Sequence, residues 1–135
     1  MTNVVHLAIV TKPPVKMLRI LHCLRATVGG LFRHVRDLAR EQAARGHKVG
    51  VICDANAKDP LTEARLLELA PSLALGLHKV PMSREVGFSD ISAARTTRQI
   101  ALEAKADILH GHGAKGGAYA RIAGRHIRRT GASIL

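Results

Sequence analysis

Short apolar segments alternate along the chain with longer segments in which hydrophobic residues recur at helical spacing. Continuous apolar runs of about four to eight residues are typical of strands buried on both faces, whereas a 3.6-residue period predicts amphipathic helices. The predicted strands are 18–24, 48–54, 77–82, 107–110 and 132–135. The predicted helices are about 31–45, 61–70, 90–104 and 118–129. This alternation indicates an α/β fold with a parallel sheet and right-handed crossovers.

Single residues mark some of the predicted helix boundaries. Gly46 follows the first helix, at the place where a left-handed residue commonly ends a helix. Asp90 is the predicted N-cap of the third helix. The first helix is expected to bury one face and to expose arginines on the other. The predicted buried face consists of Leu31, Val35, Leu38, Ala39 and Gln42.

The two ends of the chain bear on its domain organisation. Residues 1–16 are predicted to be an N-terminal extension, because Pro13 and Pro14 interrupt the short apolar run 4–10. The domain itself is predicted to span 17–135. Since the last predicted strand coincides with the end of the chain, we expect the sequence to be a fragment of a longer protein.

Composition narrows the class of protein. A length of 135 residues suits one domain, and two Phe, one Tyr and no Trp imply an aliphatic core. No apolar run reaches the roughly 18 residues of a membrane span, and no signal peptide is expected. The two cysteines, Cys23 and Cys53, lie in apolar runs. We expect them to be buried, reduced thiols of a cytoplasmic protein.

The formal net charge of +11 predicts an anionic partner. Candidates are nucleic acid, an anionic membrane surface and phosphorylated substrates. The scarcity of aromatic side chains argues against nucleic acid, which proteins usually stack on aromatic rings. Two groups of arginines are candidate membrane-facing residues, with an ordinary solvated helix face as the alternative. They are Arg33, Arg36 and Arg40 on the first helix and Arg121, Arg125 and Arg128, followed by Arg129, on the last.

A glycine pair follows the first predicted strand. Gly29 and Gly30 lie where a parallel sheet binds ligands, at the carboxyl end of a strand and before a helix. Paired glycines allow the backbone to approach a ligand, and the free N–H groups of a helix N-terminus attract anions. The pair is neither a P-loop nor a dinucleotide fingerprint, because the further residues of those motifs are missing. A tight turn without a ligand is the alternative.

The fourth predicted strand ends at His110, and His112 and Lys115 follow it. His112 is expected to project into the crevice beyond the strand, where it can hydrogen-bond a sugar hydroxyl or contact a reacting centre. A metal site at His110 and His112 requires further ligands. His22 is a conceivable third ligand, but no carboxylate accompanies it, and we expect no bound metal. Histidines that merely bond to the loop backbone are the alternative.

The order of these motifs resembles the N-terminal domain of glycosyltransferase family 4, the retaining enzymes of the GT-B fold. The resemblance covers about residues 17–135, through loose motifs in a fairly specific order. The matching segments are 18–24, 29–35 (GGLFRHV), 45–49 (RGHKV), 82–85 (MSRE), 106–112 (ADILHGH) and 115–121 (KGGAYAR). It implies a Rossmann-like sheet flanked by helices, the N-terminal half of a GT-B enzyme whose C-terminal donor domain is missing here.

The resemblance also implies a function. A family member moves a sugar from a nucleotide-sugar donor to a glycan or lipid-linked acceptor, in bacterial polysaccharide or cell-envelope assembly, at the inner face of the membrane. Gly29 and Gly30 would lie near the donor phosphates and His112 beside the transferred sugar. His110, Gly113 and Lys115 would complete the substrate site. No cofactor is implied, and this chain alone is expected to be inactive. The alternative is a free-standing α/β module that binds an anionic ligand or nucleic acid.

Overall fold

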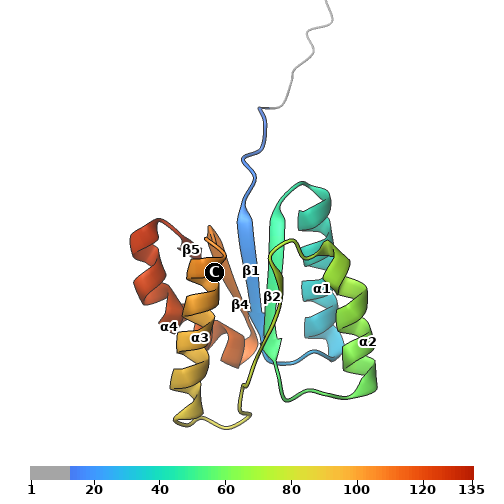
Figure 1. The fold of residues 1–135 in the computed structure, drawn as a ribbon, viewed down its shortest axis with the longest axis vertical. Coiled ribbons are helices and arrows are strands. Elements are labelled where there is room, and N and C mark those ends of the chain that lie inside the picture. The colour runs from blue at the N-terminus through green and yellow to red at the C-terminus, as the bar shows by residue number, and fades with distance from the viewer. Residues whose placement is uncertain (1–12) are drawn as a thin grey trace, which may run out of the picture.

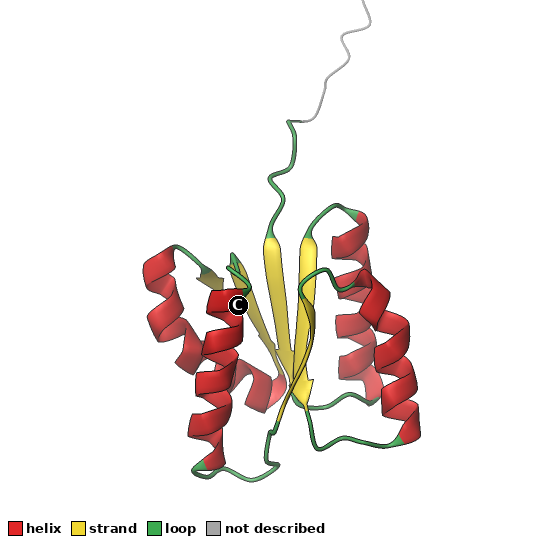
Figure 2. Cartoon of the chain, in the orientation of Figure 1, coloured by secondary structure: helices red, strands yellow, loops and turns green. Residues whose placement is uncertain are grey.

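A computed structural model describes residues 13–135 and contains one sheet of five parallel strands (Figure 2). The short apolar run 4–10 and most of the predicted extension lie outside the described residues. The order across the sheet is β3-β2-β1-β4-β5. The strands are β1 (Arg19–Leu24), β2 (Lys48–Asp54), β3 (Gly76–Val80), β4 (Ile108–His112) and β5 (Ser133–Ile134). The predicted parallel α/β sheet is therefore confirmed.

The helices form one layer on each face of the sheet. In Figure 1, α1 and α2 lie to the right of the strands, and α3 and α4 lie to the left. Their bounds are α1 (Gly29–Ala44), α2 (Pro60–Leu69), α3 (Ser89–Glu103) and α4 (Gly113–Ile127). Short 3₁₀ turns continue α2 and α4, at Ala70–Ser72 and Arg128–Thr130. The strands end at the lower edge of Figure 1, where the loops leading into α1 and α3 and the start of α4 come together.

Two aliphatic cores fill the space between the sheet and its helices. On the α3–α4 side, Leu21 and Cys23 of β1 pack with residues of both helices. On the α1–α2 side, Leu24 packs with Phe32 and other residues of those helices. This alternation of β1 side chains follows from the two-residue period of a strand. The expected buried thiols are also confirmed, since Cys23 and Cys53 are both free and buried.

Two sequence predictions about element boundaries are wrong. Asp90 is not the N-cap of α3, because Phe88 occupies that position and Asp90 lies in the first helical turn. The strand predicted to end at 110 continues to His112, and α4 begins at Gly113, inside the segment expected to be a loop. The strand continues because Gly111 pairs with Cys23 of β1 and its N–H donates to the Leu135 carbonyl.

A glycine in α4 explains how a helix forms in this glycine-rich segment. A Cβ atom on Gly116 would lie 2.2 Å from the Cys23 carbonyl oxygen. The absence of a side chain at Gly116 therefore lets the first turns of α4 pack directly against the backbone of β1. This close approach places the start of α4, and His112 immediately before it, against the centre of the sheet.

Candidate functional site

A cleft of about 620 Å³ opens at the carboxyl edge of the sheet. Its walls come from the segment after β1, the first turn of α1, the loop before α3 and the first turns of α4. The apolar part of the wall is formed by Ala26, Leu31, Val86, Ala118 and Ile122. Arg25 and Arg84 supply positive charge at the same cleft. The cleft therefore combines an apolar wall with cationic groups, an arrangement that suits an amphipathic ligand with an anionic part.

The structure divides the predicted site residues among three places. His112, Gly113 and Lys115 line the cleft together. Gly29 and Gly30 line a separate hollow of about 300 Å³. His110 lines neither of these spaces. The hollow and the cleft both begin at the first turn of α1, since Gly30 lines the hollow and the neighbouring Leu31 lines the cleft.

The hollow at Gly29 and Gly30 is strongly cationic. Arg33, Arg36 and Arg65 line it, together with the two glycines. Gly29 has a φ of +78°, a backbone conformation that favours glycine. The N-terminus of α1 lies here, and its free N–H groups carry a partial positive charge. Helix terminus and guanidinium groups together make this hollow suitable for a phosphate or another small anion.

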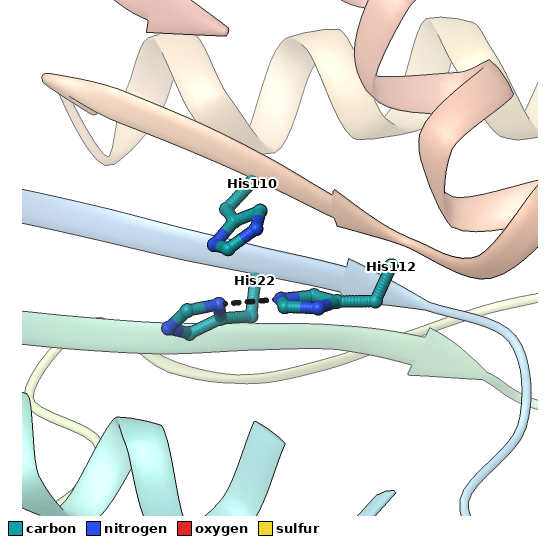
Figure 3. Close-up of side chains that lie close together, drawn as sticks. All are labelled: His22, His110 and His112. Atoms are coloured by element: carbon teal, nitrogen blue, oxygen red, sulfur yellow. Dashed lines mark hydrogen bonds between the residues drawn. The ribbon is translucent and has the colours of Figure 1, made fainter. Parts of the chain in front are cut away.

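Three histidines meet on the α1 side of the sheet (Figure 3). His22 of β1 is directly opposite His110 of β4 in the parallel register, and His112 follows two positions later on the same face of β4. The His22 ring centroid lies 5.4 Å from that of His110 and 5.1 Å from that of His112. The centroids of His110 and His112 are 4.0 Å apart. Strand pairing has therefore joined a residue of the first strand to the two histidines of the fourth.

Hydrogen bonds fix the tautomers of two of these rings. The Nε2–H of His22 donates to the Gln42 Oε1 at 2.7 Å, which leaves the Nδ1 of a neutral His22 as an acceptor. The Nε2–H of His112 then donates to that Nδ1, across 2.9 Å. The remaining nitrogen of His112, Nδ1, is left as an acceptor for a ligand in the cleft.

Burial keeps these rings neutral. Desolvation lowers the pKa of His22 to about 4, against the upward effect of its bond to Gln42, and the charges of His110 and His34 lower it further. Desolvation also lowers the pKa of His112 to about 4, with the positive charges of His110, His22 and His34 acting in the same direction. The pKa of His110 is lowered by burial and by His34. Neutral imidazoles are the forms that accept hydrogen bonds and bind metals.

Lys115 is held by protein groups at the rim of the cleft. Its Nζ donates to the Glu85 carbonyl at 2.8 Å and to the Asp90 Oδ1 at 2.7 Å. The hydroxyl of Tyr119 donates to the same carboxylate oxygen at 2.5 Å. Lys115, followed by the Tyr119 hydroxyl and the Gly87 N–H, lowers the pKa of Asp90 to about 2. Lys115 therefore ties the loop before α3 to α4, and its charge is largely balanced by Asp90.

The two arginine groups form two separate surfaces. Arg33 and Arg40 are exposed on α1, and Arg36 is partly buried beside Asp37, 2.9 Å from its carboxylate. The exposed residues of the second group, Arg121, Arg125 and Arg128, belong to α4 and the turn after it. Because α1 and α4 cover opposite faces of the sheet, the groups are not parts of one surface. No helix within residues 13–135 has the length and apolar character needed to cross a bilayer.

Sequence reasoning missed several residues of the site. Arg65 in the hollow and Arg25 in the cleft carried no local signal, whereas Arg84 of the cleft lies in the matching segment 82–85 but was not predicted as a site residue. Gln42 did carry one, because it is a polar residue on the predicted buried face of α1, and such a residue requires a hydrogen-bond partner. Its partner, His22, becomes apparent only when the helix is placed on the sheet.

Comparison with known proteins connects this architecture with glycosyl transfer. Residues 28–134 match the profile of Glycosyltransferase Family 4. A glycosyltransferase from Rickettsia africae ESF-5 superposes with a TM-score of 0.68 at 17% identity, over 89% of this chain and 29% of that one. MurG from Acinetobacter baumannii superposes with a TM-score of 0.63 at 17% identity, over 87% of this chain and 34% of that one. The chain thus spans about a third of the length of these two proteins.

The fold itself is not restricted to transferases. The C-terminal domain of a hydrogenase from Pyrococcus furiosus superposes with a TM-score of 0.59 at 16% identity, over 93% of this chain and 95% of that domain. None of the curated proteins matches the chain. Similar folds carry unrelated functions, so the match to the family profile identifies the chain more specifically than the superpositions do.

Proposed function

This chain belongs to glycosyltransferase family 4, and from this premise we propose that it forms the acceptor-side half of a retaining, two-domain glycosyltransferase. The complete enzyme moves a sugar from a nucleotide-sugar donor to a glycan or lipid-linked acceptor. The observation that carries the proposal is the position of His112, which ends β4 at the cleft on the carboxyl edge of a family 4 domain. A second domain of the same protein supplies most of the donor site.

The cationic hollow supports binding of the donor. The N-terminus of α1 lies there, and Arg33, Arg36 and Arg65 line the hollow, with Arg36 also paired with Asp37. A diphosphate is a suitable ligand, because helix N-termini and arginines both bind phosphate oxygens by charge-assisted hydrogen bonds. In this proposal Gly29 and Gly30 let the donor phosphates approach the backbone, at the side of the cleft where the second domain closes.

His112 supports positioning of the transferred sugar. Its Nε2–H is committed to His22, so its Nδ1 accepts a hydrogen bond from a sugar hydroxyl. The apolar wall of the cleft then covers the less polar face of the sugar or the lipid part of the acceptor. Gly113 lies beside the ligand, while Lys115 holds the loop that forms one wall. In this proposal His110 does not touch the ligand, and it supports the His112 ring by packing on it.

A place in bacterial envelope or polysaccharide assembly, on the cytoplasmic side of the membrane, is part of the same proposal. A net charge of +11 and two exposed arginine surfaces suit an enzyme that docks on anionic lipid to reach a lipid-linked acceptor. No cofactor is required for this reaction beyond the nucleotide-sugar, which is a substrate.

A free-standing module that binds an anionic ligand is the second candidate, and the hollow with its three arginines favours it. The two candidates differ in what the gene encodes after Leu135. A transferase requires a second α/β domain in the frame, whereas a stop codon at that point would leave only the binding module.

The direct test of the proposal is an activity measurement on the complete protein. The His112→Ala variant is expected to lower turnover with a nucleotide-sugar by about 10- to 100-fold, because it removes a buried hydrogen bond to the sugar. The matched control is His126→Ala, which removes an exposed histidine from α4 and should leave turnover unchanged. Unchanged turnover in His112→Ala would remove this residue from the mechanism, and absence of sugar transfer by the complete protein would refute the proposed activity.

A further inference from the structure

We propose that His22, His110 and His112 form a site for one transition-metal ion, zinc in the first place. One nitrogen from each ring can be chosen so that all three atoms lie within 4.8 Å of one another. Three histidine ligands are sufficient for a zinc site, as in carbonic anhydrase. This inference depends on the geometry of the cluster and is independent of the proposed transferase activity.

The strand geometry holds the three rings on one side of the sheet. Residues two apart on a strand point to the same face, which brings His110 and His112 together. His22 is the register partner of His110 on the adjacent strand. Figure 3 shows the three rings close together in front of β1, on one side of the sheet. Because all three ligands come from the centre of the sheet, the site is held by rigid backbone and is largely formed before the metal binds.

The distances fit a metal ion once the side chains move, since the three nitrogens lie within 4.8 Å of one another and a zinc ion draws its ligands nearer than that. In a tetrahedral zinc site with Zn–N bonds of about 2.0–2.1 Å, two ligand nitrogens lie about 3.3 Å apart. The Nδ1 of His22 and the Nε2 of His112 are 2.9 Å apart, joined by a hydrogen bond. A metal ion that replaces the shared proton needs these atoms to separate by about 0.4 Å, and it needs both rings to turn so that their lone pairs converge on the ion instead of facing each other. His112 then carries its remaining proton on Nδ1, so in the metal-bound form this nitrogen donates to a sugar oxygen, whereas in the metal-free form it accepts from a hydroxyl.

Gln42 supplies the outer contact that a histidine ligand needs. Metal-bound histidines usually donate their second N–H to a protein oxygen, and this bond fixes the ring orientation. The Nε2–H of His22 donates in this way to the Gln42 Oε1 at 2.7 Å. The bond directs the lone pair of the His22 Nδ1 toward His112. Gln42 is thus a positioning residue for the proposed metal site.

Burial and access are both suitable for metal binding. His22 is fully buried and His112 is 7% exposed, so water competes little for their nitrogens. His110 is only partly buried, so the cluster is not sealed from solvent. Three protein ligands leave the fourth tetrahedral position open for water or another small ligand. Borderline ions that favour imidazole, such as Zn²⁺ and Co²⁺, suit this set, whereas Mg²⁺ and Ca²⁺ require oxygen ligands.

The test is metal binding by the complete chain, prepared without a histidine tag. Equilibrium dialysis with Zn²⁺ is expected to give one ion per chain, and Co²⁺ should give the intense visible absorption of a four-coordinate complex. Mg²⁺ should not compete. In an NMR spectrum of the wild-type imidazole nitrogens, Zn²⁺ should shift the signals of three of the eight histidines. A stoichiometry clearly below one, or shifts in only a single exposed histidine, would overturn the proposal.

Two variants and a control locate the site. His110→Gln removes a partly exposed ligand and should weaken Zn²⁺ binding by more than about 100-fold, a larger effect than the loss of an outer contact. Gln42→Leu keeps all three ligands and should weaken binding by about 10- to 100-fold. His126→Gln, on the exposed side of α4, should leave binding unchanged. Equal affinity in wild type and His110→Gln would overturn the site, whatever the transferase activity of the complete protein.

Discussion

At the scale of single residues, the Asp90 carboxylate is the negative charge at the rim of the cleft to which several neighbouring groups donate hydrogen bonds. It accepts hydrogen bonds from Lys115, Tyr119 and the Gly87 N–H, and these partners lower its pKa to about 2. Because the folded pKa lies below the ordinary value near 3.8, the ionised group stabilises the folded chain above about pH 4. This contribution is lost as the pH falls from about 4 to about 2.

We therefore expect Asp90→Asn to be less stable than wild type in urea near pH 7 and near pH 5, by a similar amount. Near pH 3 the difference should become smaller, because wild-type Asp90 is then taking up its proton. The matched control is Asp37→Asn, which alters an exposed carboxylate beside Arg36 and should have little effect on the unfolding midpoint near pH 7. A difference between Asp90→Asn and wild type that stays constant to pH 3 would contradict the proposed role of the charge.

The residues of the site could be predicted only as far as local sequence specifies them. The end of an apolar run places His112 near the carboxyl edge of the sheet, but not in the strand itself, which continues to His112. The pairing of His22 with His110 does not, because it depends on which strands are neighbours and in what register. The boundary between β4 and α4 could not be predicted from the sequence either. The glycines in that segment favour a loop locally and become helical through packing on β1.

At the scale of elements, the fit of α4 on β1 depends on one of two adjacent glycines. Gly116→Ala would place a Cβ atom 2.2 Å from the Cys23 carbonyl, so the helix must move away from the strand. We expect the free energy of unfolding to fall by about 1–3 kcal/mol. Gly117→Ala meets no atom within 4 Å and should raise it by about 0.5–1 kcal/mol, because alanine favours a helix. Urea unfolding of the two variants measures both effects, and equal stabilities would show that α4 does not depend on this contact.

The strands and helices themselves were the most predictable part of the fold. Lys48–Asp54 was predicted with its observed bounds, because the glycine before the apolar run and the polar loop after it set both ends of the strand. The alternation of such runs with amphipathic helices led to the parallel sheet, and the buried aliphatic cores followed from the scarcity of aromatic residues. The order of the strands across the sheet required the structure, since distant strands pair through contacts that local sequence does not encode.

At the scale of the whole molecule, the distribution of arginines restricts how the domain can lie on a membrane. The group on α1 and the group at the end of α4 belong to layers on opposite faces of the sheet, so a flat bilayer can contact only one of them closely. None of the ion pairs within residues 13–135 involves the α4 group, whereas Arg36 of the α1 group is paired with Asp37. The half-exposed Ile122 lies beside the α4 arginines. For the proposed docking on a membrane, these features favour the α4 surface.

The prediction that follows distinguishes the two surfaces by vesicle sedimentation at low salt. Neutralising Arg121, Arg125 and Arg128 with glutamine should weaken binding to anionic vesicles by about 100-fold, from about 1 kcal/mol for each basic residue near the surface. Neutralising Arg33, Arg36 and Arg40 removes the same formal charge and should change binding only a few-fold, through the long-range field alone. Equal losses in the two triple variants would mean that net charge, and not a defined face, attracts the protein. Absence of binding by the wild type would refute membrane docking altogether, while leaving the sugar-transfer proposal to its own test.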